Sequence, residues 1–398
     1  MRRLFKTQDH QITLIRIYTI CMMATFMLPI IVPYYHQVIG LSFRDFLIGE
    51  AVFSAVVILG EVPSGYLSDI WRRKHVLALG VINTIIGYIL LLIARDFWIA
   101  VLAQGVIGIG VSLCSGTVQA IMYDHLLSKK EEGKFRQLEG QRLGLGMYAL
   151  AIGAVLGGLL YQSSPFLPLI MDVAIMIIGL AAALMLQEPP RTKTDPRHSP
   201  LQDIWDTAKY ALHGHKDIAG IILFSAILFA GSKILLWAQQ PYYLELGLPE
   251  YIFGFLIAGG ALLGGLGGQF GHKLDGRMRN RSILGACLGL LLIACVTSGS
   301  FIWYHGVLLL MSGSLIWGIG SPHVQDAINI RVGSERRATI LSTASLMVHI
   351  LFIPLSFVIG WIDEGHGIGA SLIGLAGIVG GLALLFRFGL WRNGTRRR

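Results

Sequence analysis

Long apolar runs alternate with short charged segments along the whole 398-residue chain. An α-helix needs about 20 apolar residues to cross the hydrocarbon core of a bilayer, and most of the runs have about this length. The pattern predicts twelve membrane-spanning helices, at residues 11–39, 46–68, 75–94, 97–127, 143–162, 167–187, 218–244, 250–271, 282–300, 304–330, 338–361 and 367–390. We therefore expect an all-α membrane protein.

One polar stretch, residues 188–216, is much longer than the other connections. Its Pro-rich start breaks helix, and from Leu201 onward apolar residues recur at helical spacing, which predicts an amphipathic helix along the membrane face. The stretch separates six spans from six. The expected organisation is an N-terminal bundle at 1–187, a linker at 188–216, and a C-terminal bundle with a basic tail at 217–398.

The two halves also repeat each other. The segment PYYHQVIGLS begins at Pro33 and PYYLELGLPE begins at Pro241, and GYLSD at 65–69 is matched by GHKLD at 271–275. Asp124 and Asp326 end the fourth span of their respective halves. Two repeated six-helix halves predict a transporter whose substrate binds between them.

Composition supports a membrane protein, and the distribution of charge predicts its orientation. Hydrophobic residues make up 54% of the chain and charged residues 14%. When connections are assigned to alternate sides, 28 of the 32 Lys and Arg residues fall on one side, and only Arg44 and Arg95 fall on the other. Positive residues concentrate in cytoplasmic loops, so we expect both termini to lie in the cytoplasm. The net charge of +9 then reflects topology, and no nucleic-acid partner is expected.

The segment GYLSDIWRRK resembles the signature loop between helices 2 and 3 of the major facilitator superfamily, G-x-L-x-D-R-x-G-R-K. Two positions, Ile70 and Arg72, depart from the pattern, and five fit it, namely Gly65, Leu67, Asp69, Arg73 and Lys74. A weaker copy, GHKLDGRMRNR, follows the eighth span. The resemblance implies the fold of that family, with two pseudo-symmetric bundles of six helices each, and transport by alternating access.

Other segments bear on the branch of the family. The segments GEVPSG before the signature, YD at the end of the fourth span and RATILS at the start of the eleventh are similar to a drug-exporter-like bacterial branch. Gln104 stands where many members of the family carry an Arg implicated in proton coupling. The antiporter pattern of helix 5 is met at Gly140, Gly153 and Gly157, but one further Gly and the Pro are replaced by Ala. These departures leave the coupling ion and the direction of transport open.

Ionisable residues inside membrane spans are costly, so they usually face a cavity or a partner. Lys233 lies near the middle of the seventh span, which predicts a cavity-facing role such as holding an anionic group; the alternative is a structural ion pair. Glu61 and Asp172 are the candidate proton carriers, unless they only bond to neighbouring helices. Arg16 either lines the pathway or reaches the cytoplasmic interface, and Glu50, near the end of its span, is expected to be solvated.

Uncharged polar residues extend this candidate pathway. Gln239 and Gln240 follow Lys233 toward the outer end of the seventh span. Tyr34, in the first span, is the repeat mate of Tyr242 in the seventh. For Tyr34, an interfacial aromatic belt is the alternative explanation. His323 could titrate near neutral pH, but a hydrogen-bonded structural histidine is favoured over that role.

A second candidate set lies on the expected cytoplasmic face. Its carboxylates end the even-numbered spans 2, 4, 8 and 10, and its guanidinium groups begin spans 3, 5 and 11. The resemblance implies that such contacts join the two halves when the cytoplasmic side is closed; solvated charged loops are the alternative. The predicted gate comprises Asp69, Arg73, Asp124, Arg142, Asp275, Asp326 and Arg337.

The resemblance to a bacterial branch implies a secondary active transporter of the bacterial inner membrane. We expect it to export a small amphipathic compound, such as a drug, metabolite or siderophore, in exchange for protons. Import of a small anionic nutrient is the alternative, motivated by Lys233 and the incomplete helix-5 pattern. No nucleotide-binding signature, metal-ligand spacing or catalytic cluster is evident, so we expect no cofactor, no metal and no enzyme activity. A transport-dead sensor is a more remote alternative. The expected partners are the substrate, protons and membrane lipid, and the protein is expected to be a monomer.

Overall fold

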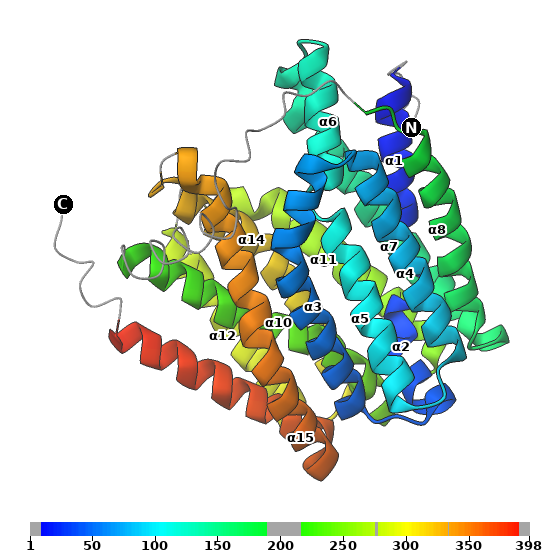
Figure 1. The fold of residues 1–398 in the computed structure, drawn as a ribbon. Coiled ribbons are helices and arrows are strands. Elements are labelled where there is room, and N and C mark those ends of the chain that lie inside the picture. Colours follow the sequence, from blue (N-terminus) through cyan, green and yellow to red (C-terminus); the bar gives the residue numbers. More distant parts are fainter. Residues whose placement is uncertain (1–8, 189–215, 275–277, 333, 390–398) are drawn as a thin grey trace, which may run out of the picture. The chain divides into compact units, whose positions relative to one another are not determined.

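The computed structural model describes residues 9–188, 216–274, 278–332 and 334–389, and the regular secondary structure within these ranges is helical (Figure 1). The amphipathic helix predicted from Leu201 lies outside the described residues. All twelve predicted spans coincide with helices, which confirms the all-α fold class.

In the N-terminal half, the first and fourth predicted spans are interrupted, and the other four are single helices. The first span consists of α1 (His10–Met23), η1 (Leu28–Ile30), α2 (Ile31–Tyr34) and the π-helical turn η2 (Tyr35–Ile39). It is followed by α3 (Phe43–Ile70), α4 (Arg73–Ile93), α5 (Phe97–Cys114), α6 (Thr117–Ser128), η3 (Glu132–Lys134), α7 (Phe135–Ser163) and α8 (Leu167–Met185).

In the C-terminal half, the first span is one continuous helix, and the fourth span is again divided in two. The helices of this half are α10 (Lys216–Glu245), α11 (Glu250–Phe270), η5 (Gly271–Leu274), α12 (Asn280–Ser300), α13 (Tyr304–Leu310), α14 (Ser312–Asn329) and α15 (Ser334–Gly389). The 56 residues of α15 cover the last two predicted spans, which meet at Gly367, where a φ of 79° breaks the helix. Among the described residues, ten segments are long and apolar enough to cross a membrane, and the last of them, Ile340–Phe386, covers both of these spans.

The chain forms two compact units, and both are discontinuous in sequence. The first comprises Met1–Gly40, Ala55–Arg197 and Glu250–Ala258, and the second comprises Leu41–Ser54, His198–Pro249 and Gly259–Arg398. Helices α3 and α11 are therefore each divided between the units. The first turns of α3 pack with C-terminal helices, and the first turns of α11 pack with N-terminal ones.

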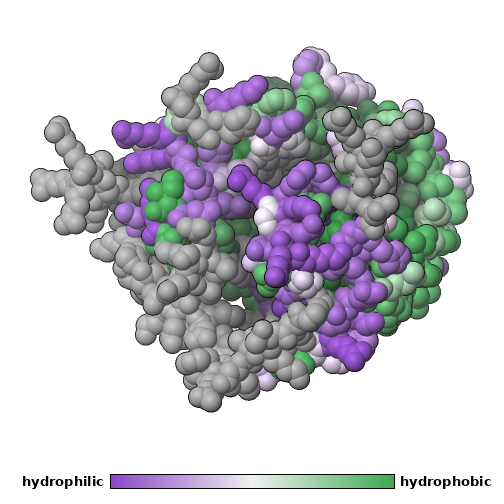
Figure 2. All heavy atoms as spheres, turned by 90° about the horizontal axis from the view of Figure 1, so that it is seen from above, coloured by the Kyte–Doolittle hydropathy of each residue, from purple (hydrophilic) through white to green (hydrophobic). Residues whose placement is uncertain are grey.

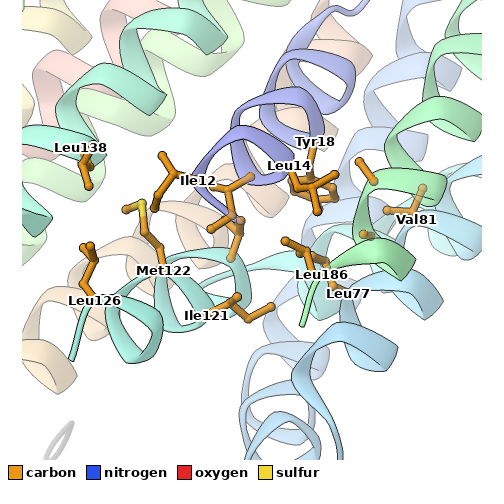
Figure 3. Packing of buried hydrophobic residues seen from close by; sticks show 14 of the residues in the cluster. Ile12, Leu14, Tyr18, Leu77, Val81, Ile121, Met122, Leu126, Leu138 and Leu186 are labelled. Atoms are coloured by element: carbon orange, nitrogen blue, oxygen red, sulfur yellow. The ribbon is translucent and has the colours of Figure 1, made fainter. Parts of the chain in front are cut away.

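Apolar side chains from helices distant in sequence form the core of the first unit (Figure 3). Close packing of the backbones requires small residues, as in other membrane bundles. On α5, a Cβ atom added to Gly110 would lie 2.3 Å from Oγ1 of Thr84 on α4, so only Gly permits this approach. The core cluster includes Ile12, Leu14, Tyr18, Leu77, Val81, Ile121, Met122, Leu126, Leu138 and Leu186.

The surface divides into apolar and polar regions. Large apolar side chains are exposed on the helices, for example Trp98 on α5 and Leu385 on α15, as expected where lipid is the solvent. The face at which α1 begins and α6 ends is largely hydrophilic, with hydrophobic residues at its margin (Figure 2). The four cysteines are free thiols, and none of them is exposed.

Candidate functional site

The ammonium group of Lys233 on α10 is held by residues of two other helices. Its Nζ lies 3.3 Å from Oε2 of Glu50 and donates a hydrogen bond of 3.1 Å to Oγ of Ser54, both on α3. It also lies 3.9 Å from the ring centroid of Phe352 on α15, a cation–π contact. All these residues belong to the second unit. The ion pair that was the alternative to a cavity-facing role for Lys233 is thus present, and the partner of Lys233 is Glu50.

The expectation that Glu50 is solvated is wrong, because only 6% of the residue is exposed. The first turns of α3 pack against the C-terminal helices, so a position near the end of a span lies inside the unit. The sequence did offer one signal, since a carboxylate and an ammonium both occur within apolar spans. Two desolvated charges need each other, because each is strongly unfavourable alone.

A cavity of about 360 Å³ adjoins Lys233 and is lined by α10, α14 and α15. Its apolar wall includes Phe229 and Trp317, whose rings stack with centroids 4.5 Å apart. Four further polar side chains line it, from Ser225, Ser321, Gln325 and Ser345. An apolar pocket with a few convergent polar groups is the usual form of a small-molecule site.

His349 on α15 also lines this cavity and was not among the predicted site residues. Its Nδ1 atom is buried and has no hydrogen-bond partner among the described residues. Buried polar atoms without partners are rare in proteins, because each one costs desolvation free energy. In a cavity wall, such an atom is a natural contact for a ligand. A lone histidine in an apolar run gave no pattern from which this role could be predicted.

Asp172, a predicted proton carrier, is fully buried on α8 and has a different environment. Its two carboxylate oxygens accept hydrogen bonds of 2.9 Å from the backbone N–H groups of Phe26 and Met27. These donors lie where the first span is broken between α1 and η1, so Asp172 satisfies N–H groups that the break leaves without helical partners. Gly157 of α7 packs at the same break, because a Cβ there would lie 1.8 Å from the carbonyl oxygen of Phe26.

Two other charged candidates belong to the first unit. Arg16 on α1 is buried and donates a hydrogen bond of 2.7 Å to Oε1 of Gln141 on α7. Glu61 on α3 is half-buried, and its backbone carbonyl accepts a bond from the Ser64 hydroxyl. Neither residue is among those that line the Lys233 cavity.

The polar candidates are buried and take part in hydrogen bonds within their units. Gln239 donates to the carbonyl of Leu310 at 3.2 Å and accepts a bond of 3.0 Å from the Tyr243 hydroxyl, and Gln240 is also buried. Tyr34 is fully buried and donates to the carbonyl of Leu91 at 3.2 Å, an environment unlike an interfacial belt. His323 is buried, and its Nδ1 lies 2.6 Å from the carbonyl oxygen of Ile319 one turn earlier.

The predicted gate is described in part, and its two halves show related contacts. Asp124 at the end of α6 forms an ion pair with Arg73, the first residue of α4. Asp326 at the end of α14 accepts a hydrogen bond of 2.9 Å from Asn280, the first residue of α12. The second half therefore replaces the cation with an amide.

The other predicted gate residues make local contacts or lie outside the described parts. Arg142 forms an ion pair of 2.7 Å with Glu139 on the same helix and bonds to the Thr19 hydroxyl at 3.3 Å. Asp69 lies one residue before the end of α3, and Arg337 lies in the first turn of α15, but the side chains of both are outside the description. Asp275 lies outside the described residues altogether.

Asp9 anchors the start of α1 on the hydrophilic face, a contact not predicted from the sequence. It accepts a hydrogen bond from the backbone N–H of Gln11 and contacts His125 at 2.8 Å and Lys129 at 2.9 Å. Partial burial raises the pKa of the Asp9 carboxyl, but the bonds from Lys129 and His125 outweigh burial and lower it to about 2. The contribution of these contacts to the stability of the fold is therefore fully present above the ordinary pKa of an aspartate, and it is lost as the pH falls through about 2.

The family model of the Major Facilitator Superfamily matches residues 14–356. The chain therefore belongs to this superfamily, as its signature loop indicated, and it is a transporter. It is 25% identical over 299 residues to the class B tetracycline resistance protein of Escherichia coli, covering 73% of this chain and 72% of that one. It is 24% identical over 353 residues to a probable sugar efflux transporter of Helicobacter acinonychis (strain Sheeba), covering 85% and 83%.

Solved structures confirm the fold. The nucleoside transporter NupG matches with a TM-score of 0.78 and 13% identity, over 96% of this chain and 100% of that chain. A bacterial homologue of the human lysosomal transporter Spinster matches with a TM-score of 0.75 and 16% identity, over 95% and 96%. At such identities the likeness extends to the fold and not to the substrate.

Proposed function

We propose that this chain is a secondary transporter of a bacterial inner membrane that exports a small amphipathic compound in exchange for protons. Its family and its apolar helices support a multi-pass transporter. The excess of basic residues on one side supports cytoplasmic termini. The relatives named as tetracycline resistance proteins and as a probable sugar efflux transporter support export.

The observation that carries the proposal is the ion pair between half-buried Lys233 and buried Glu50, beside a cavity of about 360 Å³. In such a site neither charge is stable without the other, unless a proton or a substrate group takes the partner's place. A proton on Glu50 cancels its charge and releases Lys233, and loss of that proton restores the pair. The proposal thus assigns proton binding to Glu50, in place of Glu61 and Asp172, and substrate binding to the Lys233 cavity.

Export driven by an inward proton gradient requires that substrate and proton exclude each other from the site. A substrate that presents a positive charge or a hydrogen-bond donor to Glu50 meets this requirement, because protonated Glu50 no longer attracts it. The stacked rings of Phe229 and Trp317 offer a flat apolar surface for the rest of the compound. Alternating exposure of the cavity to the two sides of the membrane would then exchange one ligand for the other.

Import of a small organic anion together with a proton is the second candidate, favoured by Lys233 and by the Nδ1 atom of His349 in the cavity wall, which has no hydrogen-bond partner among the described residues. An anion that binds Lys233 would draw this cation away from Glu50, and a proton on the buried carboxylate would then cancel its charge. Substrate and proton then bind together, so an inward proton gradient drives import.

The two candidates differ in the sign of proton exchange on binding, which a pH-indicator dye measures in weakly buffered detergent. Tetracycline, which carries an amine, and salicylate, an aromatic carboxylate, serve as probes. Proton release on binding of tetracycline supports export, and proton uptake on binding of salicylate supports import. Binding of either probe without proton exchange would overturn the coupling at Glu50.

Variants of the pair locate the binding event. Glu50→Gln is expected to weaken tetracycline binding, and Lys233→Met is expected to weaken salicylate binding, each at least tenfold, about the effect of losing one charge-assisted hydrogen bond. Asp172→Asn is the matched control, because it changes a buried carboxylate that does not line the cavity. A loss in Asp172→Asn equal to that in the variant of the pair would contradict the assignment of the cavity as the substrate site.

A further inference from the structure

A second cavity, of about 420 Å³, lies between α10, α12 and α15 of the second unit and shares no lining residue with the Lys233 cavity. Its one charged lining residue is Arg281, which lies beside Ser282 in the first turn of α12. The remaining lining is apolar, including Phe224, Leu288 and Leu292. The cavity is therefore a groove with a basic end and an apolar length.

The dimensions of this groove match one leaflet of a bilayer. Arg281 and Leu292 are eleven residues apart on α12, which at about 1.5 Å per residue gives a length of about 16 Å. The hydrocarbon core of a bilayer is about 30 Å thick, so the groove runs from the interface to about the midplane. A single acyl chain has this reach, whereas a small soluble anion would use only the basic end.

The groove also opens toward the region where lipid is expected. Leu384 in its wall is 55% exposed, and Ile293, next to the lining residue Leu292, is 57% exposed. Gly285 is exposed, and a Cβ added there would meet no atom within 4 Å, so open space lies above the floor of the groove. In a membrane, acyl chains fill such apolar space.

We propose that this groove is a binding site for an anionic phospholipid. The phosphate binds Arg281 and the Ser282 hydroxyl, where the N-terminus of α12 adds partial positive charge, and one acyl chain lies along the apolar length. A zwitterionic lipid gains less at the basic end because its own cation opposes Arg281. The proposal does not depend on the transported substrate, and either direction of transport is compatible with it.

The test compares phosphatidylglycerol with phosphatidylcholine of the same acyl chains, added to the purified full-length protein in detergent. Native mass spectrometry measures the lipid retained, and a thermal unfolding scan measures the stabilisation. Wild-type protein should retain phosphatidylglycerol in preference and show a higher midpoint with it. Inorganic phosphate at millimolar concentration should neither stabilise the protein nor displace the lipid.

Two variants separate the basic end from the apolar length. Arg281→Gln should lower the apparent affinity for phosphatidylglycerol about fivefold, the effect of one Lys or Arg near an anionic surface. Gly285→Leu should fill the groove and lower retention of both lipids. Arg279→Gln is the control for charge, and Gly265→Leu on α11, where an added Cβ also meets no atom within 4 Å, is the control for an added side chain.

Several outcomes would overturn the site. Equal retention of the two lipids by the wild type would remove the role of the phosphate charge. An equal loss in Arg279→Gln and Arg281→Gln would indicate a diffuse basic surface and no defined site. Unchanged retention in Gly285→Leu, with its unfolding midpoint without lipid equal to that of the wild type, would show that the acyl chain lies elsewhere.

Discussion

Glu50 and Asp172 are both buried carboxylates, but they have different kinds of partner. Asp172 accepts two backbone hydrogen bonds at a fixed break in the first span. Glu50 faces the ammonium group of Lys233, at the end of a flexible side chain that also borders a cavity. A partner on a flexible side chain can move away and return, whereas backbone donors at a packed break cannot. The comparison suggests that the kind of partner, and not burial alone, distinguishes an exchangeable carboxylate from a structural one.

The largest effect is expected from removing the cation of the Glu50 pair. Lys233→Met removes the cation that faces a buried carboxylate and should lower the free energy of unfolding by about 3–5 kcal/mol. Chemical denaturation in detergent measures this loss. The double variant Lys233→Met with Glu50→Gln should regain most of the stability, and a double variant as unstable as Lys233→Met alone would contradict the pairing.

Overpacking at the break that Asp172 caps should have the next largest effect. Gly157→Ala places a Cβ against the backbone carbonyl of Phe26 and should cost about 3 kcal/mol, at the upper end for an added methyl group. Gly144→Ala on the same helix is the control, since its Cβ meets no atom within 4 Å, and it should raise stability by up to about 1 kcal/mol. Similar unfolding midpoints for the two variants would show that the break is not rigid.

Replacing the structural carboxylate itself should have a smaller effect. Asp172→Asn keeps one acceptor oxygen but leaves one of the two N–H groups, that of Phe26 or of Met27, without an acceptor, which should cost about 1–2 kcal/mol. Probe affinity of the folded protein, measured by titration, should stay within about twofold of the wild type, since 1 kcal/mol at the site would already change it more. Lost binding with unchanged stability would return Asp172 to the transport site.

The smallest effects belong to the two carboxylates of the hydrophilic face, which again differ in the partner. Asp124 pairs with the Arg73 guanidinium and Asp326 with the Asn280 amide. Asp124→Asn should cost up to about 1 kcal/mol, and Asp326→Asn only a few tenths, roughly the range measured for partly exposed pairs. Raising the salt concentration should reduce the stability lost in Asp124→Asn and leave the loss in Asp326→Asn unchanged, as unfolding at low and high salt would measure. Equal salt responses would show that the ion pair contributes nothing.

Most of the fold could be predicted from hydropathy and charge. Bilayer thickness sets the length of a span, and the repeat of the two halves supports six spans in each. All twelve predicted spans coincide with helices. Hydropathy did not predict the break after α1, because Asp172 and Gly157, which cap it and pack against it, are more than 130 residues away in sequence. Contacts of this kind depend on tertiary packing, which no local pattern records.

The candidate site could be predicted only at Lys233. A lysine in the middle of an apolar span is unusual enough to be identified without a structure. Glu50 was misjudged because its depth was estimated from its position in one helix, whereas its burial comes from helices of the other half of the sequence. His349 carries no sequence signal, since its significance lies in an Nδ1 atom for which the described part of the chain offers no hydrogen-bond partner.

The placement of the four cysteines offers a practical route to the motions that transport requires. Because none of the native thiols is exposed, a bulky maleimide that cannot enter the membrane should leave the unmodified chain largely unlabelled. Single cysteines introduced at Ser321 or Ser345 in the cavity wall could then report which side of the membrane reaches the cavity, and for how long. The four native cysteines would not first have to be replaced, so the packing that these thiols provide would stay intact.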